Sequence, residues 1–527
     1  MSWWDERCLL GAPVPAAAGS KKDGKDAKKE RAGLQQKAAV MTQPDPADPL
    51  RDCYGDAPLV QSRTPSGLVR TRIQDISTAL EGQLVHVRGR LELVSGKGKA
   101  CFLKIRQRTH TIQAVMFVND STVSKGMVKY AQQLTRESVV DISGPVSVPE
   151  NPVEKCTQKQ VEIKVTAIRC ISRAEPLPFE LADAGRSETE LAANPNAVVV
   201  LQDLRLEQRF VDLRTPANQA IFRLQSAVCQ LFREALLAEG FQEIHTPKLI
   251  AGASEGGAAV FHTDYMGRPG CLAQSPQLYK QMAICGDFDR VFEITPVFRA
   301  EKSFTHRHLC EFTGLDLEMA IDEHYNEVLD VLDRLFVYIF SGLRSRFGAE
   351  LAAVNWQFPA EPLQWLPETL RLPWEEGMQL LQEAGFEPDP FGDLTTELER
   401  ELGRLVKQKY HTDFYVLYRY PLAARPFYTM PDPEDARYSN SFDVFIRGEE
   451  IISGAQRVHD PALLTERARA HEIPLDSIQP YIDSFKYGAF PHGGFGVGLE
   501  RVVMLFLGLD NIRKTSLFPR DPKRLTP

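Results

Sequence analysis

Apolar and polar side chains alternate along the first third of the chain, after a long polar start. The period of two holds in five segments rich in β-branched residues: 84–94, 101–107, 111–118, 138–146 and 161–171. Such alternation is typical of strands with one buried face, and turn-forming stretches such as SGKGK separate most of the segments. Five strands in about 100 residues predict a small closed β-barrel over residues 66–172.

The pattern changes after residue 206, where helical and strand periods mix. Apolar residues recur at three- and four-residue steps in 217–239 and 325–347, whereas DFYVLY, FDVFI and GFGVGL are short apolar strands. This mixture predicts an α+β domain over residues 206–527, with an inserted helical region around 325–410. The expected fold class is α+β: an N-terminal barrel of the OB-fold type followed by a larger mixed domain.

Two stretches lack a regular period. Residues 1–65 are rich in Ala, Pro, Gly and Lys, so we expect a largely disordered, lysine-rich extension. Its basic cluster between Lys21 and Arg31 favours a solvated tail over the alternative, an arm that grips a nucleic acid by charge. Residues 173–205 contain three prolines and are predicted to form a hinge or linker.

Composition adds a few limits. With 43% hydrophobic and 25% charged residues, the chain reads as a soluble globular protein. It has no apolar run near the ~20 residues that cross a bilayer, and its first residues resemble neither a secretory nor a mitochondrial leader. The nine cysteines are scattered without a Cys-x-x-Cys pair, which argues against structural zinc and disulfides and favours a reducing, cytoplasmic setting. The net charge of −8 does not exclude a nucleic-acid partner, because such binding depends on local patches.

Three distant segments carry the candidate chemistry, and the first is 212–250. Thr215 can cap a helix that begins at Pro216 and ends before Gly240, with one apolar stripe along its length. A strand follows and ends at Pro247. Taken alone, this segment is equally well a plain core helix.

The second segment, 291–320, is predicted to form a strand, a polar turn and a returning strand. Charged and aromatic residues around the turn include Arg299, Glu301, Arg307, His308 and Phe312. Arginine forks match phosphate oxygens and an aromatic face can stack on adenine, so the pattern suits a nucleotide. The third segment, 490–508, has four glycines before an apolar helix that contains Arg501. Glycines let a strand approach a ligand closely, but no βαβ unit follows, which argues against a dinucleotide fold.

Together the three segments resemble motifs 1, 2 and 3 of the class II aminoacyl-tRNA synthetases. Pro247 ends motif 1, Arg299 and Glu301 form the Arg-x-Glu of motif 2, and GLER at 498–501 stands in motif 3. A barrel in front of the catalytic domain resembles subclass IIb, which covers aspartate, asparagine and lysine. ASEGGAAVF, AQSPQLYKQM, EFTGLDLEMA, RPFYTMPD and SFDVFIRGEEIISGAQRVHDP are similar to the eukaryotic cytosolic aspartyl enzymes.

The resemblance covers the chain from residue 65 to its end and implies a class II catalytic domain built on an antiparallel sheet. It implies an aspartate–tRNA ligase, which uses ATP to form aspartyl-adenylate from L-aspartate and transfers the aspartyl group to the 3′ end of tRNA(Asp). Mg²⁺, a homodimer formed through motif 1 and a cytoplasmic location follow from the same resemblance. It leaves open whether the chain joins a multi-synthetase complex and whether it mischarges the tRNA for asparagine.

The resemblance also assigns site residues, with acids near the substrate ammonium and cations on its side-chain carboxylate. For aspartate it implies Glu255, Gln277, Lys280, Arg299, Asp316, Ser453 and Arg457. For ATP it implies Arg299, Glu301, Arg307, His308, Leu309, Phe312, Glu450, Gly498, Leu499, Glu500 and Arg501. Arg299, Glu450 and Arg501 are expected to carry most of the catalysis. Asp443 and Glu450, seven residues apart, are expected to bind Mg²⁺, which prefers carboxylate and phosphate oxygens.

Two further groups are expected to contact tRNA. In CFLKIRQ, alternation puts Phe102 among cations on the face opposite the core, and unpaired bases stack on such aromatics with ~1–3 kcal/mol each. The resemblance implies that Phe102, Gln113 and Glu162 face the anticodon. It assigns the loop at the tRNA 3′ end to Arg437, Tyr438, Ser439, Asn440 and Ser441.

Three alternatives keep the same catalytic fold. An asparaginyl-tRNA synthetase fits PHGGFGVGLER about as well, and Phe490 and Phe495 depart from the commoner small or proline residues; GEEIISGAQR and TGLDLEMA favour aspartate. A catalytically dead paralogue kept as an RNA-binding or scaffold protein would be expected to have lost its charged ligands. A free-standing amide-forming synthetase would lack the barrel.

Overall fold

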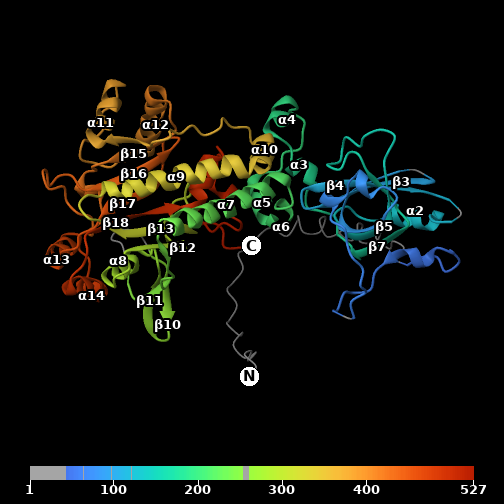
Figure 1. Ribbon diagram of the computed structural model, residues 1–527, viewed down its shortest axis with the longest axis horizontal. Helices are drawn as coiled ribbons and strands as arrows, with labels where there is room; N and C mark the ends of the chain where they lie inside the picture. Colours follow the sequence, from blue (N-terminus) through green and yellow to red (C-terminus); the bar gives the residue numbers. More distant parts are fainter. Residues whose placement is uncertain (1–42, 63, 97, 120, 253–259) are drawn as a thin grey trace, which may run out of the picture. The chain divides into compact units, whose positions relative to one another are not determined.

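The computed structural model describes residues 43–62, 64–96, 98–119, 121–252 and 260–527. The chain divides into two compact units, Met1–Leu177 and Pro178–Pro527 (Figure 1). None of the helices in the described ranges combines the length and the apolar character that a membrane crossing requires.

The first unit is a closed barrel. Its strands are β2 (Leu84–Ser95), β3 (Ala100–Gln107), β4 (His110–Phe117), β5 (Val139–Ser147), β6 (Glu162–Lys164) and β7 (Ala167–Ser172). The ring closes because β6 pairs with both β4 and β5, and α2 (Lys125–Gln132) connects β4 to β5. Cys101, Leu103 and Ile105 of β3 are almost fully buried, so the predicted alternation and the OB-type barrel are confirmed.

The last predicted barrel segment, 161–171, is divided between β6 and β7. Between these two strands the backbone changes partner, because Val165 N–H donates to the carbonyl of Val115 and Thr166 N–H donates to that of Ser143. A hydrophobic pattern does not record such a change, so one continuous strand was the natural expectation.

Part of the predicted N-terminal extension is ordered. After η1 (Arg51–Cys53), β1 (Tyr54–Asp56) pairs in parallel with β7. The Tyr54 ring is fully buried and its hydroxyl donates to Asp48 at 2.9 Å. The expectation of disorder is therefore wrong for this stretch, since one buried aromatic among polar residues leaves no detectable period. The basic cluster near the N-terminus lies outside the described residues.

Short helices fill the segment predicted as a linker and the residues just after it. They are α3 (Leu181–Ala184), α4 (Glu188–Ala193), α5 (Gln202–Glu207) and α6 (Arg209–Asp212). Ser187 and Glu190 cap α4 reciprocally, which is a local signal that helices begin there. In the barrel unit two further turns, η2 (Ile73–Asp75) and η3 (Thr78–Leu80), precede β2.

The second unit is built on an eight-stranded sheet in the order β14-β15-β16-β17-β18-β13-β12-β8. The strands are β8 (Gln242–Glu243), β12 (Arg290–Phe298), β13 (Glu311–Ala320), β14 (Leu370–Pro373), β15 (Phe414–Tyr418), β16 (Ser441–Ile446), β17 (Glu449–Gln456) and β18 (His492–Gly498). All neighbouring pairs from β15 to β13 and on to β12 are antiparallel, and only the two edge pairs are parallel. The predicted antiparallel catalytic sheet is confirmed.

Two long helices, α7 (Pro216–Ala238) and α9 (Asn326–Arg346), run side by side along this sheet (Figure 1). The predicted apolar stripe of α7 is buried against the sheet and α9 in the main core. Helices α10 (Gly348–Gln357) and α15 (Leu499–Phe506) pack against α7. Helix α9, the first part of the predicted helical insertion, therefore belongs to the main core of this unit.

The remaining elements surround the sheet. Helices α11 (Trp374–Glu383) and α12 (Thr396–Tyr410) share a separate apolar cluster with β14, β15 and β16. A small sheet contains β9 (Leu249–Ile250), β10 (His262–Tyr265) and β11 (Arg268–Leu272). The other elements are α8 (Gln277–Cys285), α13 (Pro461–Ala470), α14 (Leu475–Ser484), η4 (Leu422–Ala424), η5 (Phe485–Tyr487) and η6 (Ile512–Lys514).

Candidate active site

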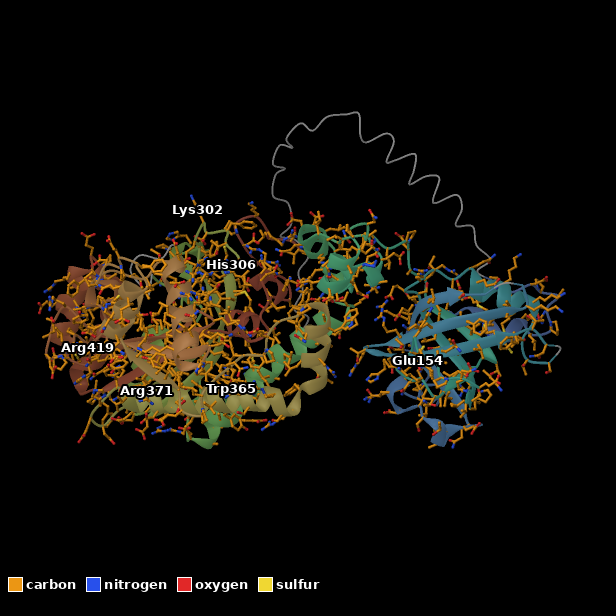
Figure 2. All side chains as sticks on the ribbon, turned by 90° about the horizontal axis from the view of Figure 1, so that it is seen from above. Glu154, Lys302, His306, Trp365, Arg371 and Arg419 are labelled. Carbon is orange, nitrogen blue, oxygen red and sulfur yellow. The ribbon has the colours of Figure 1, made fainter. Side chains whose placement is uncertain are left out.

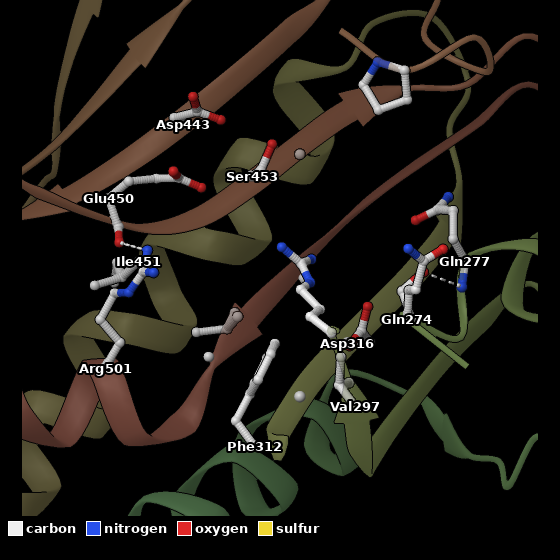
Figure 3. A pocket seen from close by; sticks show the side chains of 18 of the residues that line it. Gln274, Gln277, Val297, Phe312, Asp316, Asp443, Glu450, Ile451, Ser453 and Arg501 are labelled. Atoms are coloured by element: carbon white, nitrogen blue, oxygen red, sulfur yellow. Dashed lines mark hydrogen bonds between the residues drawn. The ribbon is translucent and has the colours of Figure 1, made fainter. Parts of the chain in front are cut away.

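A cavity of about 430 Å³ lies in the second unit, and residues of β12, β13, β16, β17 and β18 contribute to its wall (Figure 3). Most of the residues predicted for aspartate and ATP line it. They are Gln277, Arg299, Glu301, Arg307, His308, Leu309, Phe312, Asp316, Asp443, Glu450, Ser453, Arg457, Gly498, Glu500 and Arg501. Residues separated by up to 224 positions, from Gln277 to Arg501, therefore meet in one place.

At one end of the cavity, cations lie beside an aromatic ring. The Arg299 guanidinium lies 5.6 Å from the centre of the Phe312 ring, and Phe312 is on β13, opposite Val297 of β12. Arg501 of α15 donates to the backbone carbonyl of Glu450 at 2.7 Å (Figure 3) and to that of Arg307 at 3.3 Å. Arg501 therefore holds β17 and the turn between β12 and β13 together, and its position depends on both.

The turn between β12 and β13 is attached to α12. Arg307 forms an ion pair with Glu399 at 2.5 Å and donates to Thr396 Oγ1 at 2.8 Å. On the same turn, His306 contacts Glu449 at 2.9 Å, and Lys302 lies at the outer edge of the unit (Figure 2). The first turn of α12 thus holds Arg307, a residue that was predicted to bind ATP.

His308 differs from its neighbours in charge. Burial, together with the nearby cations Arg501 and Arg307, lowers the pKa of its imidazole to about 4. Its Nδ1 lies 2.6 Å from Thr305 Oγ1. The ring is therefore neutral near pH 7, so His308 can offer a hydrogen bond to a phosphate but no positive charge.

Asp443 on β16 and Glu450 on β17 form the predicted acidic pair. Burial, with Asp443 nearby, raises the pKa of the Glu450 carboxyl to about 7. Asp443 itself accepts two hydrogen bonds from Arg425, at 2.9 and 2.7 Å. Arg425 was not among the predicted site residues, although it lines the same cavity.

At the opposite end, buried charges of both signs form a network. Lys280 lies 3.1 Å from Asp316 and 3.4 Å from Glu318, and Arg457 donates to Glu318 at 2.9 Å. All four side chains are buried. Arg457 and Lys280 outweigh the effect of burial and hold the pKa of Glu318 below its usual 4.5. Lys280 lies behind the cavity wall rather than in it, and Glu318 was not predicted.

Two glycines of β18 make this network possible. A methyl group at Gly494 would lie 2.4 Å from Glu318 Oε2 and 2.2 Å from the Leu317 carbonyl, and one at Gly496 would lie 2.9 Å from Asp316 Oδ1. The sequence predicted that these glycines admit a ligand. In the structure they admit the acids of the neighbouring strand β13.

Some predicted residues lie elsewhere. Leu499 is buried under the cavity wall, and Glu255 lies outside the described residues. In the loop predicted for the tRNA 3′ end, Arg437 lines a separate hollow, whereas Ser439 and Ser441 are fully buried with their hydroxyls 2.8 Å apart. Their side chains are engaged inside the protein, so only the exposed part of this loop is available to a ligand in this conformation.

In the barrel, the three residues predicted for the anticodon share one face. Gln113 of β4 pairs with Glu162 of β6 in the strand register and donates to its carboxylate at 2.9 Å. Phe102 is 38% exposed and its ring meets that of Phe117, which is 54% exposed, edge to face at 5.7 Å. Phe117 was not predicted, because it stands at the end of its strand where alternation stops.

Similarity to known proteins agrees with both units. Residues 201–522 match the family model described as tRNA synthetases class II (D, K and N), and residues 85–171 match that of the OB-fold nucleic acid binding domain. The chain is 52% identical to Aspartate–tRNA ligase 1, cytoplasmic, from Arabidopsis thaliana over 98% of this chain and 100% of that protein.

Two solved structures give the same picture. The aspartyl-tRNA synthetase from Entamoeba histolytica is 46% identical, covers 90% of this chain and 96% of its own, and has a TM-score of 0.82. The asparaginyl-tRNA synthetase from Pyrococcus horikoshii, complexed with asparaginyl-adenylate, is 31% identical, covers 87% of this chain and all of its own, and has a TM-score of 0.75. Both the fold and the identity favour aspartate over the asparagine alternative, and the chain belongs to the class II aminoacyl-tRNA synthetases as an aspartate–tRNA ligase.

Proposed function

We propose that the cavity is the site where L-aspartate and ATP react, and that the residues predicted from the motifs have the roles given below. The observation that carries the proposal is that cations suited to phosphates and an acidic pair line one cavity, and that a buried charge network reaches its wall at Asp316 and Arg457. A nucleotide triphosphate and a dicarboxylic amino acid need this combination of fixed charges.

The first step is an in-line displacement. An oxygen of the aspartate α-carboxylate attacks the α-phosphorus, the bond to the pyrophosphate oxygen breaks, and aspartyl-adenylate and pyrophosphate form. Arg299 holds the α-phosphate and Phe312 and Arg501 hold the adenine between them. Since no protein nucleophile takes part, catalysis comes from orientation and from stabilisation of the charge that develops on phosphate.

The acidic pair fits a magnesium ion. Burial beside Asp443 raises the pKa of Glu450 to about 7, so a bound cation would favour its charged form; within the described residues no group of three or more potential ligands gathers. Two carboxylates suit an ion whose remaining ligands are phosphate oxygens and water. Bound there, Mg²⁺ would neutralise phosphate charge during the displacement.

Recognition of aspartate rests on the network around Lys280, Arg457 and Glu318. Arg457 lines the cavity and suits the side-chain carboxylate, with Lys280 behind the wall as a second cation, and Asp316 suits the substrate ammonium. Asparagine has a neutral amide in place of the carboxylate, so it would leave the cations less well compensated, which disfavours its binding.

In the second step, the 3′-hydroxyl of the terminal adenosine of tRNA(Asp) attacks the anhydride carbonyl and AMP leaves. We assign base stacking in the anticodon to Phe102, with Gln113 and Glu162 beside it, and the 3′ end to the loop from Arg437 to Ser441. A homodimer formed through α7 and a cytoplasmic location, as in the name of the Arabidopsis relative, belong to the same proposal. Membership of a multi-synthetase complex is a separate hypothesis that co-purification would test.

Pyrophosphate exchange with aspartate and with asparagine, measured side by side, tests this function. Arg299→Ala should lower aspartate-dependent exchange by orders of magnitude, because it removes a cation from the reacting phosphate. Arg233→Ala is the matched control, since Arg233 is an arginine of α7 that pairs with Glu243 and does not line the cavity. Near-normal exchange in folded Arg299→Ala enzyme, or exchange with asparagine alone, would contradict the proposal. Absence of exchange with either amino acid would favour the dead paralogue.

A further inference from the structure

Arg425 is a buried arginine in the wall of the cavity that the roles above leave unused. It follows η4 in the connection between β15 and β16 and is only 8% exposed. Its two terminal nitrogens donate to the two oxygens of Asp443, at 2.9 and 2.7 Å. This fork-to-fork contact fixes both the position and the plane of the carboxylate.

The same guanidinium also reaches the neighbouring strand. It donates to Ser453 Oγ at 3.0 Å, and Ser453 stands opposite Asp443 in the register of β16 and β17. Figure 3 shows Asp443, Glu450 and Ser453 near one another along one side of the cavity. Arg425 therefore connects the acidic pair to a residue predicted to contact the amino acid.

The arginine is itself held in place. Its guanidinium lies 3.9 Å from the centre of the Tyr420 ring, and Tyr420 is fully buried. A cation over an aromatic face is stabilised by the ring quadrupole, and burial restricts its rotamers. Lysine could supply the charge at this place, but it could not form the planar fork with both Asp443 oxygens.

An ionised carboxylate offers about four lone-pair positions, and a forked arginine uses two of them. The other lone pairs of Asp443 stay available to a cation. Residues that hold a metal ligand from behind commonly change metal affinity by ~10–100-fold when they are replaced.

We infer that Arg425 is a positioning residue, which acts through Asp443 to orient the acidic pair for Mg²⁺ and through Ser453 to align that pair with the amino acid. This inference rests on the proposed function. It adds a residue that acts through Asp443 and that sets how much magnesium the enzyme needs.

The test measures binding of a non-hydrolysable ATP analogue, α,β-methylene ATP, by calorimetry at graded Mg²⁺ concentrations. In Arg425→Lys the Mg²⁺ concentration for half-maximal binding should rise by ~10-fold or more, while binding at saturating Mg²⁺ recovers. Arg209→Lys is the matched control, since Arg209 forms a buried pair with Asp212 at 2.7 Å away from the cavity. A merely structural loss would weaken analogue binding at every Mg²⁺ concentration.

A double-mutant comparison separates the two residues. Asp443→Asn should raise the same midpoint, and Arg425→Lys should add little to it if Arg425 acts through Asp443. A wild-type midpoint in Arg425→Lys, or full additivity with Asp443→Asn, would overturn the inference. If Arg425→Lys does not fold, Arg425→Gln with Asp443→Asn leaves an uncharged pair, and its midpoint should equal that of Asp443→Asn alone; a higher midpoint would overturn the inference.

A different measurement decides the proposed function. Absence of aspartate-dependent pyrophosphate exchange in the wild-type enzyme would contradict that function, whereas the Mg²⁺ midpoints would still decide the role of Arg425.

Discussion

Replacing Glu318 by glutamine measures the contribution of one negative charge to the buried network beside the cavity. The fully buried Glu318 carboxylate lies between Arg457, at 2.9 Å, and Lys280, at 3.4 Å. Glutamine keeps the shape and one hydrogen-bond acceptor but removes the negative charge. The two buried cations are then left with Asp316 as the nearby carboxylate of the network.

Breaking a buried ion pair by removing one partner costs about 3–5 kcal/mol. For a large domain about 2 °C of Tm corresponds to each kcal/mol, so the Tm of Glu318→Gln should fall by about 6–10 °C. The Arg457 guanidinium also loses its orienting partner, so the KM for aspartate should rise by about tenfold, the value of one charged hydrogen bond. The KM for ATP should change little, because Glu318 does not line the cavity.

Thermal unfolding and pyrophosphate exchange measure the two effects. Glu243→Gln is the control, because Glu243 makes a similar forked contact with Arg233 in a partly exposed place, where an ion pair contributes about 1 kcal/mol or less. Because the pKa of Glu318 lies below its usual 4.5, its ionisation stabilises the fold above that pH. The stability difference from wild type should be complete at pH 7 and shrink as the pH falls through the folded pKa. Equal Tm values for Glu318→Gln and wild type at pH 7 would refute the reasoning.

Two other predictions test the cavity and the barrel. Phe102→Ala should raise the KM for tRNA by about 5- to 100-fold, through the loss of ~1–3 kcal/mol of stacking, and leave aspartate-dependent exchange unchanged; equal losses in both assays would contradict a role in tRNA binding. Burial and Asp443 raise the pKa of Glu450 from 4.5 to about 7, so the stability of the ligand-free enzyme falls as the pH rises from about 4.5 through about 7 and levels off above that. Glu450→Gln should therefore raise Tm relative to wild type more at pH 8 than at pH 6, and a difference that does not depend on pH would show that Glu450 titrates elsewhere.

The sequence was most informative where a period or a motif repeats. Alternation in β3 predicted which side of the strand Phe102 occupies, and helical spacing predicted the buried side of α7. The second and third motif segments predicted part of the cavity wall, whereas the first, which forms α7, contributes no residue to it. These features are local or shared by a family, and a single sequence contains them.

Contacts made across the sheet were not predictable in the same way. Glu318 stands two residues after Asp316 and so shares its face of β13, a signal that was present but resembled ordinary alternation. Arg425 and Glu399 lie in a loop and a helix, and only the folded chain brings them to Asp443 and Arg307. The buried side of the predicted 3′-end loop likewise depends on packing around Ser439, which no pattern in the loop indicates.

The glycines of β18 give this enzyme a weakness that its chemistry alone does not suggest. The shape of the cavity at the end that we propose for aspartate depends partly on the absence of side chains at Gly494 and Gly496, in a strand beside it. Adding one carbon at Gly496 would place it 2.9 Å from Asp316 Oδ1 and displace that carboxylate, and the damage would look like a defect in amino-acid selection. If only the stability of a variant in this strand were measured, its effect on the pocket would be recorded as a folding defect.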